Sequence, residues 1–86
     1  MNEYLATFYT HYGAVKFFKY CEANAVGARQ APVPRQLSAS CGVCVVFTSP
    51  SWEIVKDAED MEACFLCEAG GYRQIYSDKH DDTENK

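Results

Sequence analysis

The chain has 86 residues, of which 48% are hydrophobic and 14% aromatic, and it carries a net charge of −4 at pH 7. This length allows one domain with a modest core, and the apolar fraction excludes a chain that is disordered throughout. Eight basic against twelve acidic residues leave no basic stripe, which argues against binding to nucleic acid by phosphate neutralisation. No apolar run approaches the ~20 residues that span a bilayer, and Glu3 interrupts the start where a secretion signal would be apolar. We therefore expect no membrane association and a cytoplasmic protein.

The first element expected along the chain is a strand over residues 4–8, a short run of aromatic and branched side chains. A helix should begin at Thr10 or His11, because apolar residues then recur at three- and four-residue steps. These residues form one stripe and comprise Ala14, Phe17, Phe18, Cys21 and Ala25. Cys21 is therefore expected in the core.

Two further strands are expected on either side of a polar loop. Residues 28–33 form the second strand, which runs into prolines that cannot donate to a ladder. Residues 43–47 form the third, the run with the strongest β propensity in the chain.

A second helix and a fourth strand complete the expected elements. Thr48, Ser49 and Pro50 resemble the start of a helix. Its stripe would consist of Ile54, Ala58, Met61 and Phe65, and it would end at the glycines of positions 70–71. Residues 72–76 alternate enough to form a strand.

The resulting order β-α-β-β-α-β predicts an α+β, ferredoxin-like (split βαβ) fold, with a four-stranded antiparallel sheet and two helices on one face. The first and third strands would lie side by side at its centre. Residues 1–76 would form a single domain. Residues 77–86 show no apolar periodicity and should form a disordered polar tail.

The loop between the second and third strands holds the most informative residue, Cys41. Arg35 supplies a fixed positive charge nearby, while Ser38, Ser40 and the amide of Gly42 can donate hydrogen bonds. These influences favour the thiolate, the form that attacks, ligates metal or carries a transferred atom. The alternative is a half-buried loop cysteine without a chemical role.

This stretch resembles a family of short bacterial proteins of unknown function that are described as selenium/sulfur carrier-like domains. The shared features are Pro-Val-Pro-Arg at residues 32–35, a serine-rich turn and Cys-Gly at residues 41–42, and the resemblance covers about residues 3–76. It implies a ferredoxin-like fold and a carrier role for Cys41, which would hold a persulfide or selenosulfide. It also implies sulfur or selenium donor and acceptor proteins as partners. The chain departs from the family at Ala39, where a third serine is common.

Five cysteines are an odd number, which fits reduced thiols or a metal better than a closed disulfide framework. The Cys41-Cys44 spacing is that of a thioredoxin motif, but a strand starting at Val43 excludes the helix start that motif requires. A second pair, Cys64 and Cys67, is expected near the end of the second helix. A zinc-stabilised interaction module would use all four, namely Cys41, Cys44, Cys64 and Cys67. An interaction module without metal is the other alternative.

The remaining charged residues suggest no catalytic site. Five acids, Glu53, Asp57, Glu59, Asp60 and Glu62, are expected on the solvated face of the second helix. The chain has no glycine-rich phosphate loop and no serine-nucleophile motif, so we expect no stand-alone enzyme and no cofactor. The leading hypothesis is a sulfur or selenium carrier. The sequence leaves its donor, its acceptor and its oligomeric state open.

Overall fold

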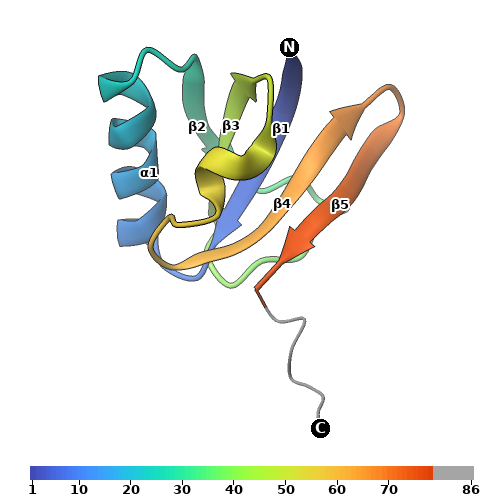
Figure 1. Ribbon diagram of the computed structural model, residues 1–86. Helices are drawn as coiled ribbons and strands as arrows, with labels where there is room; N and C mark the ends of the chain where they lie inside the picture. The colour runs from blue at the N-terminus through green and yellow to red at the C-terminus, as the bar shows by residue number, and fades with distance from the viewer. Residues whose placement is uncertain (79–86) are drawn as a thin grey trace, which may run out of the picture.

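The structure is a computed structural model that describes residues 1–78, and this part of the chain forms one α-helix and five strands (Figure 1). The elements in order are β1 (Asn2–Phe8), α1 (His11–Ala23), β2 (Ala28–Pro32), β3 (Val43–Ser49), the 3₁₀ turn η1 (Trp52–Val55), β4 (Met61–Glu68) and β5 (Gly71–Ser77). The α+β class is therefore confirmed.

The five strands form one sheet in the order β2-β3-β1-β4-β5, with every neighbouring pair antiparallel. Strand β1 lies at the centre, where Leu5 is opposite Val46 of β3 on one side and Phe65 of β4 on the other. The predicted adjacency of the first and third strands is confirmed. The strand expected over residues 72–76 is β5. The predicted count of four strands is wrong, because β4 forms a further strand where the second helix was expected.

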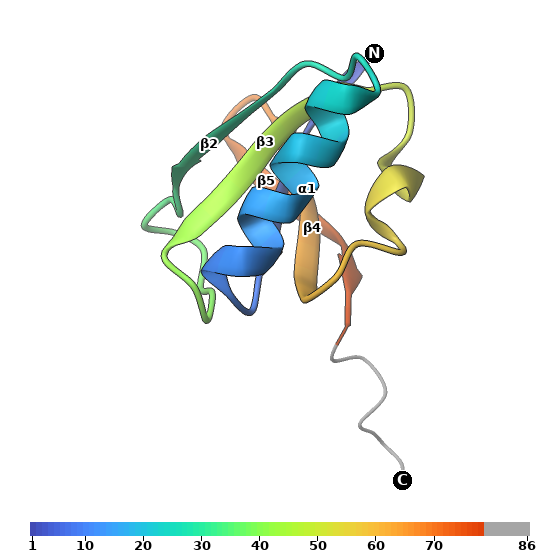
Figure 2. The same ribbon diagram turned by 90° about the vertical axis from the view of Figure 1, so that its left-hand side faces the viewer.

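Helix α1 crosses one face of the sheet (Figure 2). Its N-cap is Thr10, whose hydroxyl oxygen accepts a 3.0 Å hydrogen bond from the amide of Gly13 and donates a 2.7 Å bond to Asp60. A threonine cap satisfies one of the free amides of the first turn.

No helix in residues 1–78 is long and apolar enough to cross a membrane.

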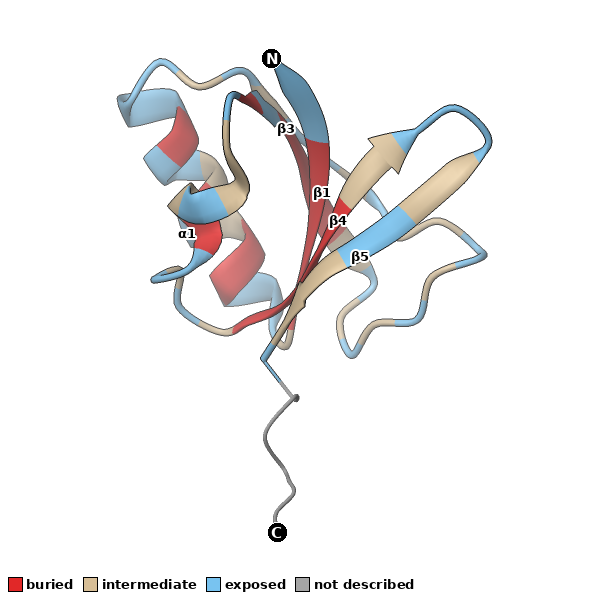
Figure 3. Ribbon diagram, turned by 45° about the vertical axis from the view of Figure 1, so that its right-hand side comes forward, coloured by how far each residue is buried: buried red, intermediate tan, exposed pale blue. Residues whose placement is uncertain are grey.

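The sheet buries side chains on both faces (Figure 3). Against α1 lie Tyr4, Ala6 and Phe8 of β1, together with Val45, Phe47, Cys64 and the helix residues Ala14, Phe17 and Cys21. The opposite face buries Leu5, Cys44, Val46, Ala63 and Phe65. Because side chains alternate between the two faces of a strand, the buried residues 4–8 of β1 contribute side chains to both clusters.

The predicted second helix is wrong. Only the four residues Trp52–Val55 are helical, as a 3₁₀ turn, and the chain re-enters the sheet at Met61. Asp60 has a φ of 61°, a left-handed conformation that no α-helix contains. Residues 61–65 are all buried, as expected for an inner strand hydrogen-bonded on both sides. The spacing that suggested a helical stripe is produced by this strand and the turn before it.

The C-terminal boundary falls slightly later than predicted. Ser77 belongs to β5, and the amide of Asp78 donates a 2.9 Å hydrogen bond to the carbonyl of Glu62. The predicted disordered tail otherwise concerns residues 79–86, which lie outside the described residues.

The close packing of α1 on the segment before β4 leads to a test at Gly13. A Cβ at this buried position would lie 2.8 Å from Asp60 Cβ and 2.8 Å from the Glu59 carbonyl oxygen. In an open helix Gly→Ala adds ~0.5–1 kcal/mol of stability. Here we expect Gly13→Ala to lower the free energy of unfolding by about 1–3 kcal/mol, because the added methyl overpacks the contact. Urea unfolding measures the change.

Gly27→Ala is the matched control. An added Cβ there meets nothing within 4 Å, so stability should stay within about 0.5 kcal/mol of the wild type. A stabilised Gly13→Ala variant would contradict the close contact between α1 and residues 59–60.

Candidate functional site

The loop that carries Cys41 spans residues 33–42 and connects β2 to β3. Its ends are joined by a 3.1 Å hydrogen bond from the amide of Val33 to the carbonyl of Gly42. Within the loop, the amide of Leu37 donates a 3.0 Å hydrogen bond to the carbonyl of Pro34. Val33 and Leu37 pack on the sheet face opposite α1, where the loop is visible in Figure 3. Apolar packing therefore holds a polar loop against the sheet.

Cys41 is half-buried near the end of this loop, two residues before β3 begins at Val43. The rejection of a thioredoxin motif is thus confirmed, because Cys41 precedes a strand and not a helix. Cys44 belongs to that strand and is fully buried, with its sulfur 3.7 Å from the carbonyl oxygen of Pro32.

Ser40 is held by a buried acid, Glu62 of β4. One carboxylate oxygen accepts a 3.0 Å hydrogen bond from the Ser40 amide, and the other accepts a 3.1 Å hydrogen bond from the Ser40 hydroxyl. Glu62 is only 7% exposed. The expectation that Glu62 lies on a solvated helix face is therefore wrong, because the residue is in a buried strand. Sequence analysis missed this contact, although a single acid inside the apolar run of residues 61–67 was a signal for it.

The other predicted supporting residues belong to the loop itself. Arg35, Ser38 and Gly42 are exposed. Within residues 1–78 no hydrogen bond or ion pair connects Arg35 or Ser38 to Cys41. Their supporting roles stay predictions.

The remaining four cysteines lie in regular elements, and all five cysteines are free thiols. Cys64 and Cys67 belong to β4, so their predicted place at a helix end is wrong. Cys64 packs on the α1 side, whereas Cys44 and Cys67 pack on the opposite side. Within residues 1–78 no group of three or more potential metal ligands is close enough to hold an ion. The four cysteines of the zinc alternative are therefore not brought together.

Burial raises the pKa of four of these thiols. The effect is largest at the fully buried Cys64, where the pKa rises to about 12, and at Cys21, where it rises to about 11. Burial also raises the pKa of Cys44 and of Cys67, which the Arg29 guanidinium partly offsets at both. A raised pKa lowers the thiolate fraction at neutral pH, so these cysteines are poor nucleophiles in the folded protein.

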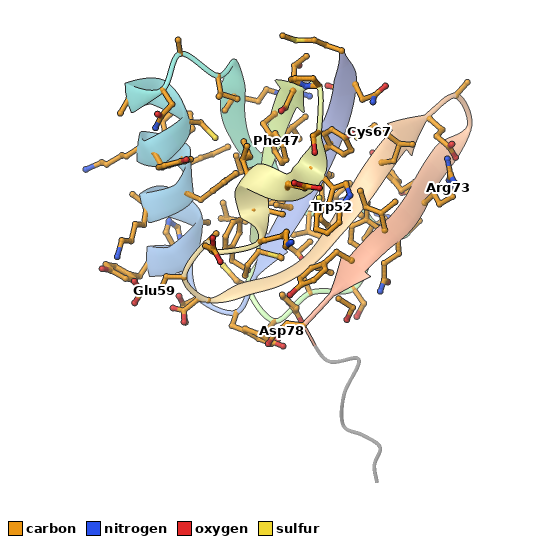
Figure 4. All side chains as sticks on the ribbon, in the orientation of Figure 1. Phe47, Trp52, Glu59, Cys67, Arg73 and Asp78 are labelled. Carbon is orange, nitrogen blue, oxygen red and sulfur yellow. The ribbon has the colours of Figure 1, made fainter. Side chains whose placement is uncertain are left out.

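Cys67 and the anchored end of the Cys41 loop lie at different positions along β4. Cys67 lies near the β4–β5 hairpin (Figure 4), whereas Glu62, which holds the loop, is near the start of β4. Five residues of strand correspond to about 17 Å. Ser40, the neighbour of Cys41, is thus held near one end of β4, and Cys67 lies near the other.

A family model described as "Putative Se/S carrier protein-like" matches residues 3–63. The chain belongs to this family. The Escherichia coli (strain K12) protein named "Uncharacterized protein YtiA" is 30% identical to it over 56 residues, which cover 65% of this chain and 66% of the relative, just under two thirds of its length. No solved structure matches the chain significantly.

The burial of Cys64 predicts how stability depends on pH. The pKa of this thiol is ~8.5 in the unfolded chain and about 12 in the folded protein. The stability that the neutral thiol contributes is therefore lost as the pH rises from the first value to the second. Cys64→Ala should cost about 1–2 kcal/mol at neutral pH by leaving a small cavity. Between about pH 8.5 and 11 that deficit should shrink by up to ~1.4 kcal/mol per pH unit.

Denaturant unfolding of the wild type and of Cys64→Ala across this pH range measures the difference in their free energies of unfolding. Val45→Ala removes a non-ionisable side chain from the same core, so its deficit should not depend on pH. A constant gap for Cys64→Ala would contradict the assignment of a buried, protonated thiol.

Proposed function

We propose that the protein carries sulfur or selenium on Cys41, as a persulfide or selenosulfide, and relays it between a donor and an acceptor protein. The observation that supports this role is the distribution of the thiols. Cys21, Cys44 and Cys64 are fully buried, whereas Cys41 is half-buried on a loop outside the strands. Membership of the carrier-like family supports a carrier role, and the matched residues 3–63 include Cys41.

The transfer step needs no external oxidant. The Cys41 thiolate attacks the outer sulfur of a donor persulfide and forms a new S–S bond, while the donor's own S–S bond breaks and its inner sulfur leaves as a thiolate with the electron pair. Delivery is the same exchange with Cys41 as the leaving thiolate. Exchange of this kind requires a thiolate and access for a second protein.

The loop residues have separate roles in this proposal. Arg35 balances the negative charge of the persulfide, and Ser38 and the Gly42 amide donate hydrogen bonds to it when the partner is in place. Ser40 acts through its contact with Glu62, which fixes the backbone just before Cys41. The protein would thus act without a cofactor and without turnover of its own.

The proposal extends to the fold and the compartment. We infer that the sheet derives from a ferredoxin-like sheet whose second helix is reduced to η1 and to which β5 is added. Five free cysteines in an 86-residue chain suit a reducing compartment, which supports a cytoplasmic location.

The decisive test is to incubate the purified protein with a cysteine desulfurase and cysteine and to map the added sulfur by mass spectrometry. We expect a mass increase of one sulfur atom at Cys41 in the wild type, and a loss of at least about tenfold in loading for Cys41→Ser, because a serine hydroxyl does not form a persulfide. Cys41→Ser should fold normally, since serine is close to cysteine in size and Cys41 belongs to neither buried cluster.

Cys67→Ser is the matched control, because Cys67 is the other half-buried thiol and lies in β4, outside the loop. It should load like the wild type. Sulfur found at Cys67 with Cys41 unmodified would refute the assignment. No loading at any cysteine would favour the alternative of a non-catalytic interaction module.

A further inference from the structure

Glu62 is a carboxylate that the chain buries inside its sheet, next to the loop of Cys41. It is 7% exposed, and each of its two oxygens accepts a hydrogen bond from Ser40. Burying a carboxylate is costly unless hydrogen bonds compensate it, and bonds to a charged group contribute about 1.5–3 kcal/mol each. The carboxylate and the loop therefore stabilise each other's position.

A bulge in β4 gives Glu62 its direction. Met61 pairs with Phe8 and Ala63 pairs with Thr7, so Glu62 is the extra residue between two regular pairs. Met61 packs on the α1 side and Ala63 on the loop side. In a regular strand Glu62 would point away from the side that Ala63 faces, into the apolar cluster under α1. The bulge re-aims it toward Ser40.

The other contacts of the loop lie at a distance from Cys41 or act on the backbone alone. Leu37 packs on the sheet four residues before Cys41, and the bond between Val33 and Gly42 closes the base of the loop. Ser40 is the residue directly before Cys41, and both of its donors are used by Glu62. Glu62 thus fixes both the backbone and the side chain of the residue that directly precedes Cys41.

We infer that Glu62 is the positioning residue of the Cys41 loop, and that its charge also selects among reagents that approach the thiol. The selection follows from distance, because covalent geometry keeps the Cys41 sulfur within about 10 Å of the carboxylate that holds Ser40. This is close to one Debye length, so the charge is felt at the sulfur. The biological meaning of the inference rests on the proposed carrier function, but its test does not.

The first measurement is amide hydrogen exchange at Ser40, followed by NMR in the full chain. Glu62→Ala should speed exchange at Ser40 by about tenfold or more, because the amide loses its charged acceptor. Glu62→Gln keeps one acceptor oxygen and should give a smaller increase. Amides of β1 serve as the internal reference, and their exchange should not change if the sheet stays folded.

The second measurement separates a positioning role from a merely structural one. Cys41 is alkylated with neutral iodoacetamide and with anionic iodoacetate, and the ratio of the two rates is read at Cys41 by mass spectrometry. Glu62→Gln removes the charge with almost no change in shape, so iodoacetate should gain about twofold relative to iodoacetamide. Glu59→Gln is the control, since it removes the same charge from an exposed acid and should leave the ratio unchanged.

Ser40→Ala tests the same contact from its other partner. Ser40 is exposed, so this variant still gives a result if a Glu62 variant fails to fold. It removes one of the two hydrogen bonds and should speed exchange of its own amide about threefold, while the retained carboxylate keeps the reagent ratio at the wild-type value.

Exchange and reagent ratios equal to the wild type in Glu62→Gln and Glu62→Ala would overturn the inference, as would unchanged exchange in Ser40→Ala. Both assays use alkylation or exchange and no sulfur donor. A protein that shows these shifts but never loads sulfur would lose the carrier role and keep Glu62 as the positioning residue.

Discussion

The central strand β1 must be covered on both faces, because none of its residues from Tyr4 to Phe8 is more than 5% exposed. It hydrogen-bonds to β3 on one side and to β4 on the other, so its backbone is satisfied within the sheet. Its side chains then alternate between two clusters, and each cluster needs its own cover. Helix α1 covers one face, and the loop of residues 33–42 covers part of the other.

This requirement explains why a polar loop has a fixed position. A ten-residue connection costs conformational entropy to order, and the loop has few hydrogen bonds of its own. Burial of Leu37 contributes ~1.5–3 kcal/mol when it is complete, and less at the half-buried state seen here. The charged contact between Glu62 and Ser40 is of similar size and adds the direction that apolar packing lacks. Packing places the loop on the sheet, and the buried acid orients its end.

The first half of the chain follows from local sequence patterns because local and tertiary preferences agree there. Thr10 is a good cap, the stripe through Phe17 faces the core, and the branched run of β3 fits an inner strand. The segment of residues 54–65 has a period that fits a helix or a turn followed by a strand. The need of β1 for a second hydrogen-bonded neighbour decides between them, and this need is a tertiary constraint that no local window contains. The single acid in the apolar run of residues 61–67 marked Glu62 as unusual, but its contact with Ser40 depends on a bulge in a strand that the pattern assigned to a helix.

The same sheet also sorts the cysteines by reactivity. Cys21, Cys44 and Cys64 face the two buried clusters, where burial raises the pKa of each thiol. A thiol with a high pKa exposes little thiolate to a persulfide or an oxidant at neutral pH. A sulfur carrier benefits from this arrangement, because a persulfide on one thiol can be lost to any neighbouring thiolate by exchange. Placing Cys41 on a loop tied to the start of β4, with Cys67 near the other end of that strand, keeps the two half-buried thiols apart without any need for a disulfide or a metal. The anchoring of Ser40 by Glu62 therefore does more than hold a loop, since it also maintains the separation on which selective loading at Cys41 would depend.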